Sequence, residues 1–368
     1  NMWLNFLNLN TGFAVGDFGK MIRTQNSGQS WENVNTPTNN ILFCIDFNAK
    51  GIGIAVGEGR TIIRSTDYGN TWNNINIGFG EKIRRVKFIN DNLIFAVGDP
   101  NLVYKSTDAG LTWSIKTTSF SGGIKGLSFV NDNIGYVVGL SGSNFKTTNA
   151  GDTWSHITLP INYTLEQVDF VNNSKGVAVG YDGAIFKISN DDWQYINTGI
   201  SSWLFGVEFA NENYVYAVGS NGRILESTNS GLSWINTGSG VSTYYDITII
   251  NGNTAFVCGS DGKIVKSTDI VNITNLSTTT PSNFSLKQNF PNPFNPNTKI
   301  RFNVRELSEV KISVFDIKGA LISTLVNNTL SVGEYEVDFR GENLPSGIYV
   351  YRMTAGSFTE TKKMNLIK

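Results

Sequence analysis

The stretch Ser65-Thr66-Asp67-Tyr68-Gly69-Asn70-Thr71-Trp72 sets the pattern for most of the chain. Its Ser and Asp side chains can bond the backbone amides of a tight turn, and Gly69 suits a backbone conformation that other residues resist. Trp72 supplies a large buried anchor for the strand that follows. We therefore interpret the stretch as a turn between two β-strands. The pattern returns at residues 24–31, 106–113, 147–154 and 227–234.

A second marker gives the length of the repeat. A small-apolar step ends in a glycine at seven places, with spacings of 41, 41, 41, 41, 39 and 40 residues. Alternating apolar residues and turn signals indicate four short strands in each repeat. A repeat of about 40 residues with four strands is typical of a propeller blade, so residues 1–271 are predicted to form a seven-bladed β-propeller. The marker glycines are Gly16, Gly57, Gly98, Gly139, Gly180, Gly219 and Gly259.

The repeated turn resembles the Asp-box, S-x-D-x-G-x-T-W, of sialidases and many other β-propellers. The resemblance implies that the turn is structural and lies away from the binding face. Residues 1–281 also resemble seven-bladed proteins related to photosystem II assembly factors and, more distantly, sialidases and xyloglucan-active glycosidases. One fold hosts many activities, so this resemblance predicts a fold and not a function.

The end of the chain has a different pattern. Residues 272–283 are rich in Thr, Ser and Asn and show no periodicity, which predicts a linker. Residues 284–368 contain alternating strands in a short length, which favours a small Ig-like β-sandwich.

This second domain resembles the C-terminal sorting domain of proteins exported by the type IX secretion system. The resemblance rests on residues 288–296, on Val314-Phe315-Asp316-Ile317-Lys318-Gly319, on Leu344-Pro345-Ser346-Gly347-Ile348-Tyr349 and on residues 362–368. It implies passage through the periplasm and release or attachment at the outer cell surface. A surface location argues against a role in photosystem assembly, and the secretion machinery becomes an expected partner.

The composition excludes some classes of function. The 29 basic and 30 acidic residues give no excess charge for general nucleic-acid binding. No apolar run is long enough to span a bilayer, so no transmembrane segment is expected. Cys44 and Cys258 lie far apart in the repeats, without zinc-type spacing. We expect isolated buried thiols, no metal and no cofactor.

The repeats act as their own alignment and point to a binding surface. Two residues before the apolar pair of each first strand vary between repeats, so the fold does not require them and they are free to bind. In a propeller these positions ring one mouth of the central channel, on the face opposite the Asp-boxes. The candidate binding residues at these positions are Arg84, Arg85, Lys125, Glu166, Gln167, Phe205, Tyr245 and Asp246. Trp203 on a nearby loop, and Glu58 and Arg60 in a turn after a marker glycine, are added as candidates on the same face.

These candidates suggest how a ligand could bind. Trp203, Phe205 and Tyr245 come from neighbouring repeats and could form an aromatic platform for a sugar ring or an aromatic group. Arg84, Arg85 and Lys125 would then form a cationic sector that holds an acidic substituent. The bland alternative is an ordinary rim of mixed residues.

Acidic residues recur in the turns after the marker glycines, and facing carboxylates are what glycoside hydrolysis needs. Acidic residues are also common turn formers beside glycine, and this structural explanation is the better one. No catalytic residue is assigned. The turn residues are Asp17, Glu58, Asp99, Asp182 and Asp261.

The sequence thus favours a secreted or surface-attached, non-catalytic propeller that binds an extracellular glycan or protein. Two alternatives stay open. One is an extracellular glycoside hydrolase that uses a carboxylate pair on the mouth face. The other is a structural surface protein or adhesin.

Overall fold

The computed structural model describes residues 2–78, 80–117, 122–250, 254–268, 273–277, 281–330, 332–341 and 344–368. The chain divides into two compact units, Asn1–Thr268 and Asp269–Lys368. Residues 269–271 at the end of the expected propeller, and residues 272 and 278–280 of the expected linker, lie outside the described residues.

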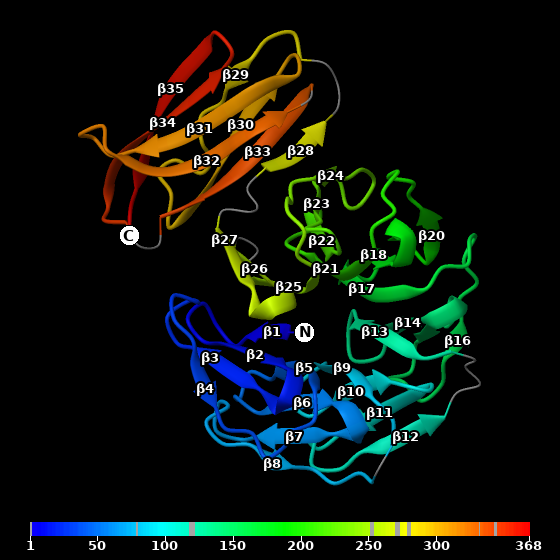
Figure 1. The fold of residues 1–368 in the computed structure, drawn as a ribbon. Helices are drawn as coiled ribbons and strands as arrows, with labels where there is room; N and C mark the ends of the chain where they lie inside the picture. The colour runs from blue at the N-terminus through cyan, green and yellow to red at the C-terminus, as the bar shows by residue number, and fades with distance from the viewer. Residues whose placement is uncertain are drawn as a thin grey trace. The chain divides into compact units, whose positions relative to one another are not determined.

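The first unit is a ring of antiparallel sheets (Figure 1). Its described residues form seven sheets, of which six have four strands and the last has three. The first strands of neighbouring sheets contact one another around the ring, and β1 contacts β25. These first strands are β1 (Met2–Phe6), β5 (Leu42–Phe47), β9 (Ile83–Phe88), β13 (Ile124–Phe129), β17 (Leu165–Asn172), β21 (Leu204–Phe209) and β25 (Tyr244–Ile250).

The second strands end at the marker glycines and are almost entirely buried, because both of their faces are covered by neighbouring sheets. They are β2 (Gly12–Gly16), β6 (Gly53–Gly57), β10 (Ile94–Gly98), β14 (Gly135–Gly139), β18 (Lys175–Gly180), β22 (Val215–Gly219) and β26 (Thr254–Gly259). The third strands are β3 (Met21–Thr24), β7 (Ile62–Ser65), β11 (Leu102–Ser106), β15 (Phe145–Thr147), β19 (Ile185–Ser189), β23 (Ile224–Ser227) and β27 (Ile264–Thr268).

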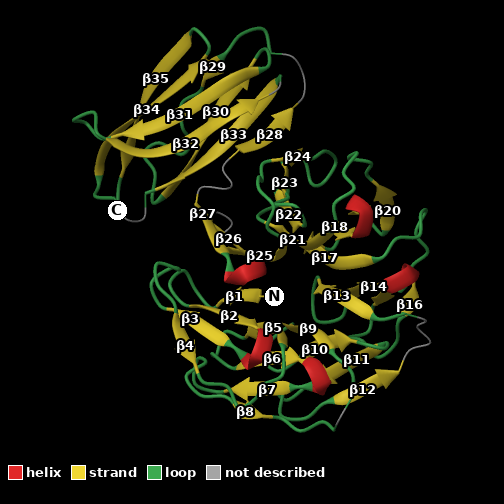
Figure 2. Cartoon of the chain, in the orientation of Figure 1, coloured by secondary structure: helices red, strands yellow, loops and turns green. Residues whose placement is uncertain are grey.

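The fourth strands are short and complete six of the sheets. They are β4 (Glu32–Val34), β8 (Asn73–Asn74), β12 (Ser114–Thr117), β16 (Ser155–His156), β20 (Asp192–Tyr195) and β24 (Ile235–Asn236). Five three-residue 3-10 turns follow second strands, drawn red in Figure 2, and the described residues contain no α-helix. The turns are η1 (Asp17–Gly19), η2 (Glu58–Arg60), η3 (Leu140–Gly142), η4 (Tyr181–Gly183) and η5 (Ser260–Gly262).

The repeated turn, called the box turn below, is held by its own side chains. The Gly69 amide donates to Ser65 Oγ at 2.9 Å, and the Thr71 amide donates to Asp67 Oδ1 at 2.9 Å. Trp72 Nε1 donates to the Gly69 carbonyl at 3.1 Å. The same bonds recur in residues 106–113. The turn chemistry that the sequence predicts is therefore present.

Box turns also contact the preceding sheet. Gly151 lies so close to strand β10 that a Cβ would come within 2.4 Å of the Phe95 ring. Lys105 of β11 forms an ion pair of 3.1 Å with Asp152 of the next box turn. The last sheet repeats this contact with the first, because Lys266 Nζ donates to the Ser27 carbonyl at 2.8 Å. Each box turn is thus a junction between two sheets.

The hydrophobic core lies between neighbouring sheets. In several sheets an aromatic residue of the first strand stacks on the second strand of the sheet before it, as Phe129 does on Phe95 with a centroid distance of 4.5 Å. Phe6 of the first sheet stacks on Phe256 of the last at 4.2 Å. The ring therefore closes through the same packing that joins the other sheets, although no described sheet contains strands from both ends of the unit.

The second unit consists of two four-stranded antiparallel sheets. One has the order β28–β33–β30–β29 and the other β32–β31–β34–β35. The predicted all-β fold, a propeller followed by a small sandwich, is confirmed. The strands are β28 (Ile273–Ser277), β29 (Ser285–Leu286), β30 (Asn297–Val304), β31 (Ser308–Phe315), β32 (Leu321–Leu330), β33 (Gly333–Arg340), β34 (Gly347–Ala355) and β35 (Phe358–Leu366).

The expected linker differs from the prediction in part, because its residues Ile273–Ser277 form strand β28. This strand pairs antiparallel with β33 along four residues. β28 is an edge strand and forms backbone hydrogen bonds on one side only. This segment can therefore form a strand although its apolar residues show little periodicity.

Candidate functional site

The mouth residues that the sequence singles out are placed by a β-bulge. In the second sheet Leu42 pairs with Gly57 and Cys44 pairs with Val56, which leaves Phe43 without a partner in the ladder. The same shift occurs in every later sheet of the ring. Bulges commonly re-aim a side chain beside a functional site. The bulge residues are Phe43, Arg84, Lys125, Glu166, Phe205 and Tyr245.

Part of the bulge ring is aromatic. Phe205 contacts Trp203 at a centroid distance of 6.4 Å and Tyr245 at 5.5 Å. The predicted platform residues are therefore neighbours. Trp203 is 44% exposed, and Tyr181 stacks on it at 4.1 Å with an interplanar angle of 7°. A rigid, flat and solvent-facing indole is thus held in place from behind.

The aromatic contacts continue across the junction of the last and first sheets. Trp3 lies 6.1 Å from Tyr245 and 5.5 Å from Phe43. β1 has no bulge, and Trp3 fills the gap that this leaves in the ring. We call the continuous series the aromatic arc. Its members, in order, are Tyr181, Trp203, Phe205, Tyr245, Trp3 and Phe43.

The expected cationic sector does not present open charges. Arg84 Nη2 lies 2.6 Å from Asp99 Oδ2, and its Nε donates to both Asp99 oxygens at 3.1 Å. Lys125 forms an ion pair with Glu166 and donates to the Tyr181 hydroxyl at 3.1 Å. Both cations therefore already have a carboxylate partner within the protein.

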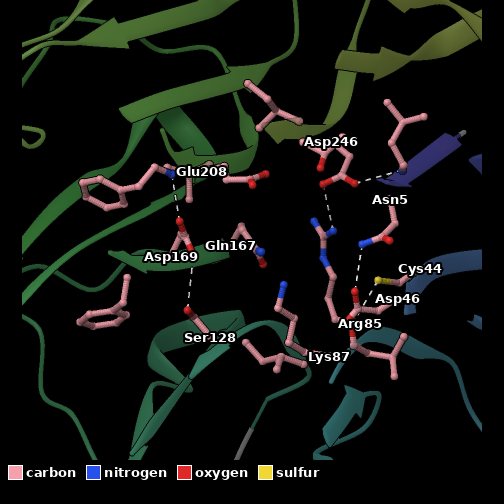
Figure 3. Close-up of a pocket in the computed structure, with 18 of the residues that line it drawn as sticks. Asn5, Cys44, Asp46, Arg85, Lys87, Ser128, Gln167, Asp169, Glu208 and Asp246 are labelled. Atoms are coloured by element: carbon pink, nitrogen blue, oxygen red, sulfur yellow. Dashed lines mark hydrogen bonds and ion pairs between the residues drawn. The ribbon is translucent and has the colours of Figure 1, made fainter. Parts of the chain in front are cut away.

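Arg85 and Asp246 meet over the channel, although they are far apart in the sequence. Arg85 Nη1 lies 3.2 Å from Asp246 Oδ1, and Asp246 Oδ2 accepts the Leu4 amide at 3.2 Å (Figure 3). Burial lowers the pKa of Arg85, but the adjacent Asp246 carboxylate more than offsets this and leaves the pKa raised. Burial raises the pKa of Asp246, and Arg85 offsets that only in part. The ion pair links the third sheet to the last one, and the bond between Asp246 and Leu4 joins the last sheet to the first.

Three other predicted residues lie outside the arc. Arg60 lies over the Tyr104 ring of the next sheet, with its Cζ 5.8 Å from the centroid. It sits in the turn η2 together with Glu58, and neither belongs to the arc. Gln167 lines the channel below the mouth.

A polar layer deeper in the channel escaped the sequence prediction. It consists of the residue between the two apolar positions of each first strand, which the alternation of a strand turns toward the axis. Together with neighbouring residues the whole layer lines a cavity of about 210 Å³ (Figure 3). The signal was present in the repeat, because the flanking apolar pair marks the position. The residues are Asn5, Asp46, Lys87, Ser128, Asp169, Glu208 and Thr248.

Carboxylates of this layer join neighbouring sheets. Asp46 Oδ2 accepts the Phe88 amide at 2.7 Å, and Asp169 Oδ2 accepts the Phe209 amide at 2.9 Å. Burial raises the pKa of Asp46, raises that of Asp169 to about 6, and raises that of Glu208 well above its ordinary value. No group of three potential metal ligands occurs among the described residues. The bonds from Asp46 and Asp169 to amides of the next sheet give these two carboxylates a structural role.

A second cavity, of about 440 Å³, brings two of the acidic turn residues together. Asp17 and Asp261 both line it, beside the 79%-exposed Phe18. Both carboxylates also act on Tyr245 of the arc, whose pKa is raised by burial first and then by Asp17 and Asp261. The other acidic turn residues do not line this cavity, and Asp99 is paired with Arg84.

Comparison with known families finds two matching models. Residues 23–119 match the model described as Photosynthesis system II assembly factor YCF48, and residues 288–367 match the Secretion system C-terminal sorting domain. A comparison with curated proteins finds no match. No helix among the described residues is both long and apolar enough to span a membrane.

Solved structures with a similar fold are β-propellers. YCF48 bound to D1 peptide is 18% identical, with a TM-score of 0.63 over 73% of this chain and 90% of that one. YCF48 from Cyanidioschyzon merolae is 17% identical, with a TM-score of 0.61 over 72% and 94%. The GH74 enzyme of Niastella koreensis is 16% identical, with a TM-score of 0.62 over 98% of this chain and 65% of that one.

At these identities the similar structures support the fold alone, whereas the two family matches fall on separate parts of the chain. The second match carries a defined role in export. The chain therefore combines a β-propeller, in which residues 23–119 match the YCF48 model, with a C-terminal sorting domain that directs export through the type IX secretion system to the cell surface or beyond.

Proposed function

We propose that this secreted propeller is a non-catalytic binding protein whose extracellular ligand, a glycan or a protein, lies on the aromatic arc. The observation that carries the proposal is the unbroken series of six aromatic rings at one mouth of the channel, with centroid spacings between 4.1 and 6.4 Å. Aromatic side chains supply large contact areas at low entropic cost and are common anchors of binding sites.

The frame of the repeat supports a functional origin for the arc. The position of Phe205 and Tyr245 holds Arg84, Lys125 and Glu166 in other sheets, so the fold does not require an aromatic residue there. A similar propeller has been solved with a peptide bound, which keeps a protein ligand open beside a glycan. The sorting domain supports a ligand that is outside the cell.

A second candidate, an extracellular glycoside hydrolase, is favoured by one observation. Asp17 and Asp261 line the same cavity, and both act on Tyr245 of the arc. A pair of carboxylates across a cleft is the arrangement that glycoside hydrolysis uses. Against it, the carboxylate positions coincide with turn positions, and Asp261 has the positive φ of 59° that turn residues adopt.

Binding by variants of the arc tests the proposal. After a ligand is identified on a mixed array of glycans and proteins, Phe205→Ala and Tyr245→Ala should each weaken binding by about 1–3 kcal/mol in calorimetry. Phe209→Ala, in the strand and away from the mouth, serves as the stability control. Unchanged affinity in both arc variants would refute the site. Hydrolysis that is lost in Asp17→Asn and Asp261→Asn would favour the enzyme instead.

A further inference from the structure

The charged residues beside the arc bear on the kind of ligand that it accepts. Resting on the proposed function, we infer that the arc selects an uncharged glycan and discriminates against acidic ones. This is the reverse of what the sequence predicts from Arg84, Arg85 and Lys125. The difference arises because each of these three cations already has a carboxylate partner inside the protein.

The pair of Arg84 and Asp99 is the most accessible of the three. Its side chains are 30% and 22% exposed, and three contacts of 2.6 to 3.1 Å join them. A planar guanidinium engaged by both oxygens of one carboxylate has strong directional bonds. An acidic substituent on a ligand would have to displace Asp99 before it could use Arg84.

The second pair is more enclosed. Lys125 and Glu166 have side chains only 9% and 15% exposed. The Lys125 ammonium also donates to the Tyr181 hydroxyl and lies 5.0 Å from the centre of the Tyr181 ring. The Lys125 ammonium thus holds Tyr181 in position, and Tyr181 stacks on Trp203 of the arc.

The third pair, Arg85 with Asp246, is as enclosed as the second, with side chains 11% and 13% exposed. Arg85 Nη2 also donates to the Phe205 carbonyl at 3.4 Å, so it supports the backbone under the arc. An anion that drew Arg85 away would leave Asp246 buried without its charge partner, which is costly.

An uncharged sugar meets none of these obstacles. The apolar face of a sugar ring can stack on the exposed indole of Trp203, and the sugar hydroxyls can bond the outer edges of the ion pairs without breaking them. A carboxylated sugar gains no free cation and brings its charge close to Asp99 and Glu166. The Trp203 indole is flat and is held by the stacked Tyr181 ring. Such a surface suits the face of a sugar ring better than a peptide side chain, which binds best in a pocket.

The test is an array that carries neutral oligosaccharides, uronate-bearing oligosaccharides and unmodified peptides, probed with the full chain. The wild type should bind neutral members and not uronates, and Trp203→Ala should lose the signal. Asp99→Asn, which frees the charge of Arg84, should raise affinity for uronates about tenfold. Asp152→Asn removes a paired carboxylate on the box-turn side and should change nothing. Glu166→Gln replaces Asp99→Asn if the latter fails to fold.

The outcomes separate the two proposals. Uronate binding by the wild type that equals or exceeds neutral binding would overturn the inference and leave the binding function standing. The same holds for arc-dependent binding of peptides alone, or for a folded Asp99→Asn that gains no uronate affinity. If no member of the array binds in a manner that depends on Trp203, the proposed function itself fails.

Discussion

Gly151→Ala tests whether the box turns hold neighbouring sheets together. Gly151 has a φ of +76°, where a residue with a Cβ costs about 1–2 kcal/mol. The new methyl group would also lie 2.4 Å from Cε1 of Phe95. Phe95 is fully buried and stacked on Phe129, so it has little room to move, and overpacking of this kind costs about 1–3 kcal/mol. We expect a total loss of about 2–5 kcal/mol in the free energy of unfolding.

Gly199→Ala is the matched control. Gly199 has a similar φ of +70°, but nothing lies within 4 Å of the Cβ position, so this variant carries the backbone cost alone. All eight tryptophans lie between residues 3 and 234, so tryptophan fluorescence in urea reports on the propeller without a signal from the sandwich. The reasoning is wrong if the two variants lose the same stability, because the contact between sheets would then contribute nothing.

Two further predictions concern export and pH. Deletion of residues 269–368, which removes β28 together with the sheet it joins, should leave the propeller in the periplasm of a host with type IX secretion, and fractionation with immunoblotting would check this; surface delivery of the truncated chain would contradict it. Burial raises the folded pKa of Asp169 to about 6, so its contribution to stability is fully present below about pH 4 and is lost as the pH rises through 6. The wild type should therefore gain stability relative to Asp169→Asn between pH 7 and pH 4 in urea titrations, and parallel pH profiles would exclude this role.

The fold was predictable because its signals are local. The marker glycines and box turns recur in the sequence, and each turn is held by side chains within eight residues of one another. The bulge residues were found for the same reason, since they occupy a fixed place in the repeat. The repeat frame thus located Phe205 and Tyr245 without any knowledge of the ring.

The partners of the mouth residues were not predictable in the same way. Arg85 meets Asp246 across 161 residues of sequence, and no local pattern announces that contact. Tyr181 directly follows a marker glycine. Asp17 and Asp99 occupy the same place in other repeats, so the position was considered only as a source of carboxylates. The channel residue Asp169 stands between two apolar residues that we used only as core markers, although strand alternation turns it to the axis.

The closure of the ring has a consequence for finding the ligand. The first and last sheets share no strand in the described part of the ring, and the arc crosses their junction where Trp3 contacts Tyr245. A ligand that contacts both Trp3 and Tyr245 binds only the closed propeller. By mass action its binding should therefore raise the melting temperature of the propeller. Thermal-shift screening can therefore identify the ligand before any activity is known. Trp3→Ala should abolish the shift, because it removes the aromatic contact between the first and last sheets.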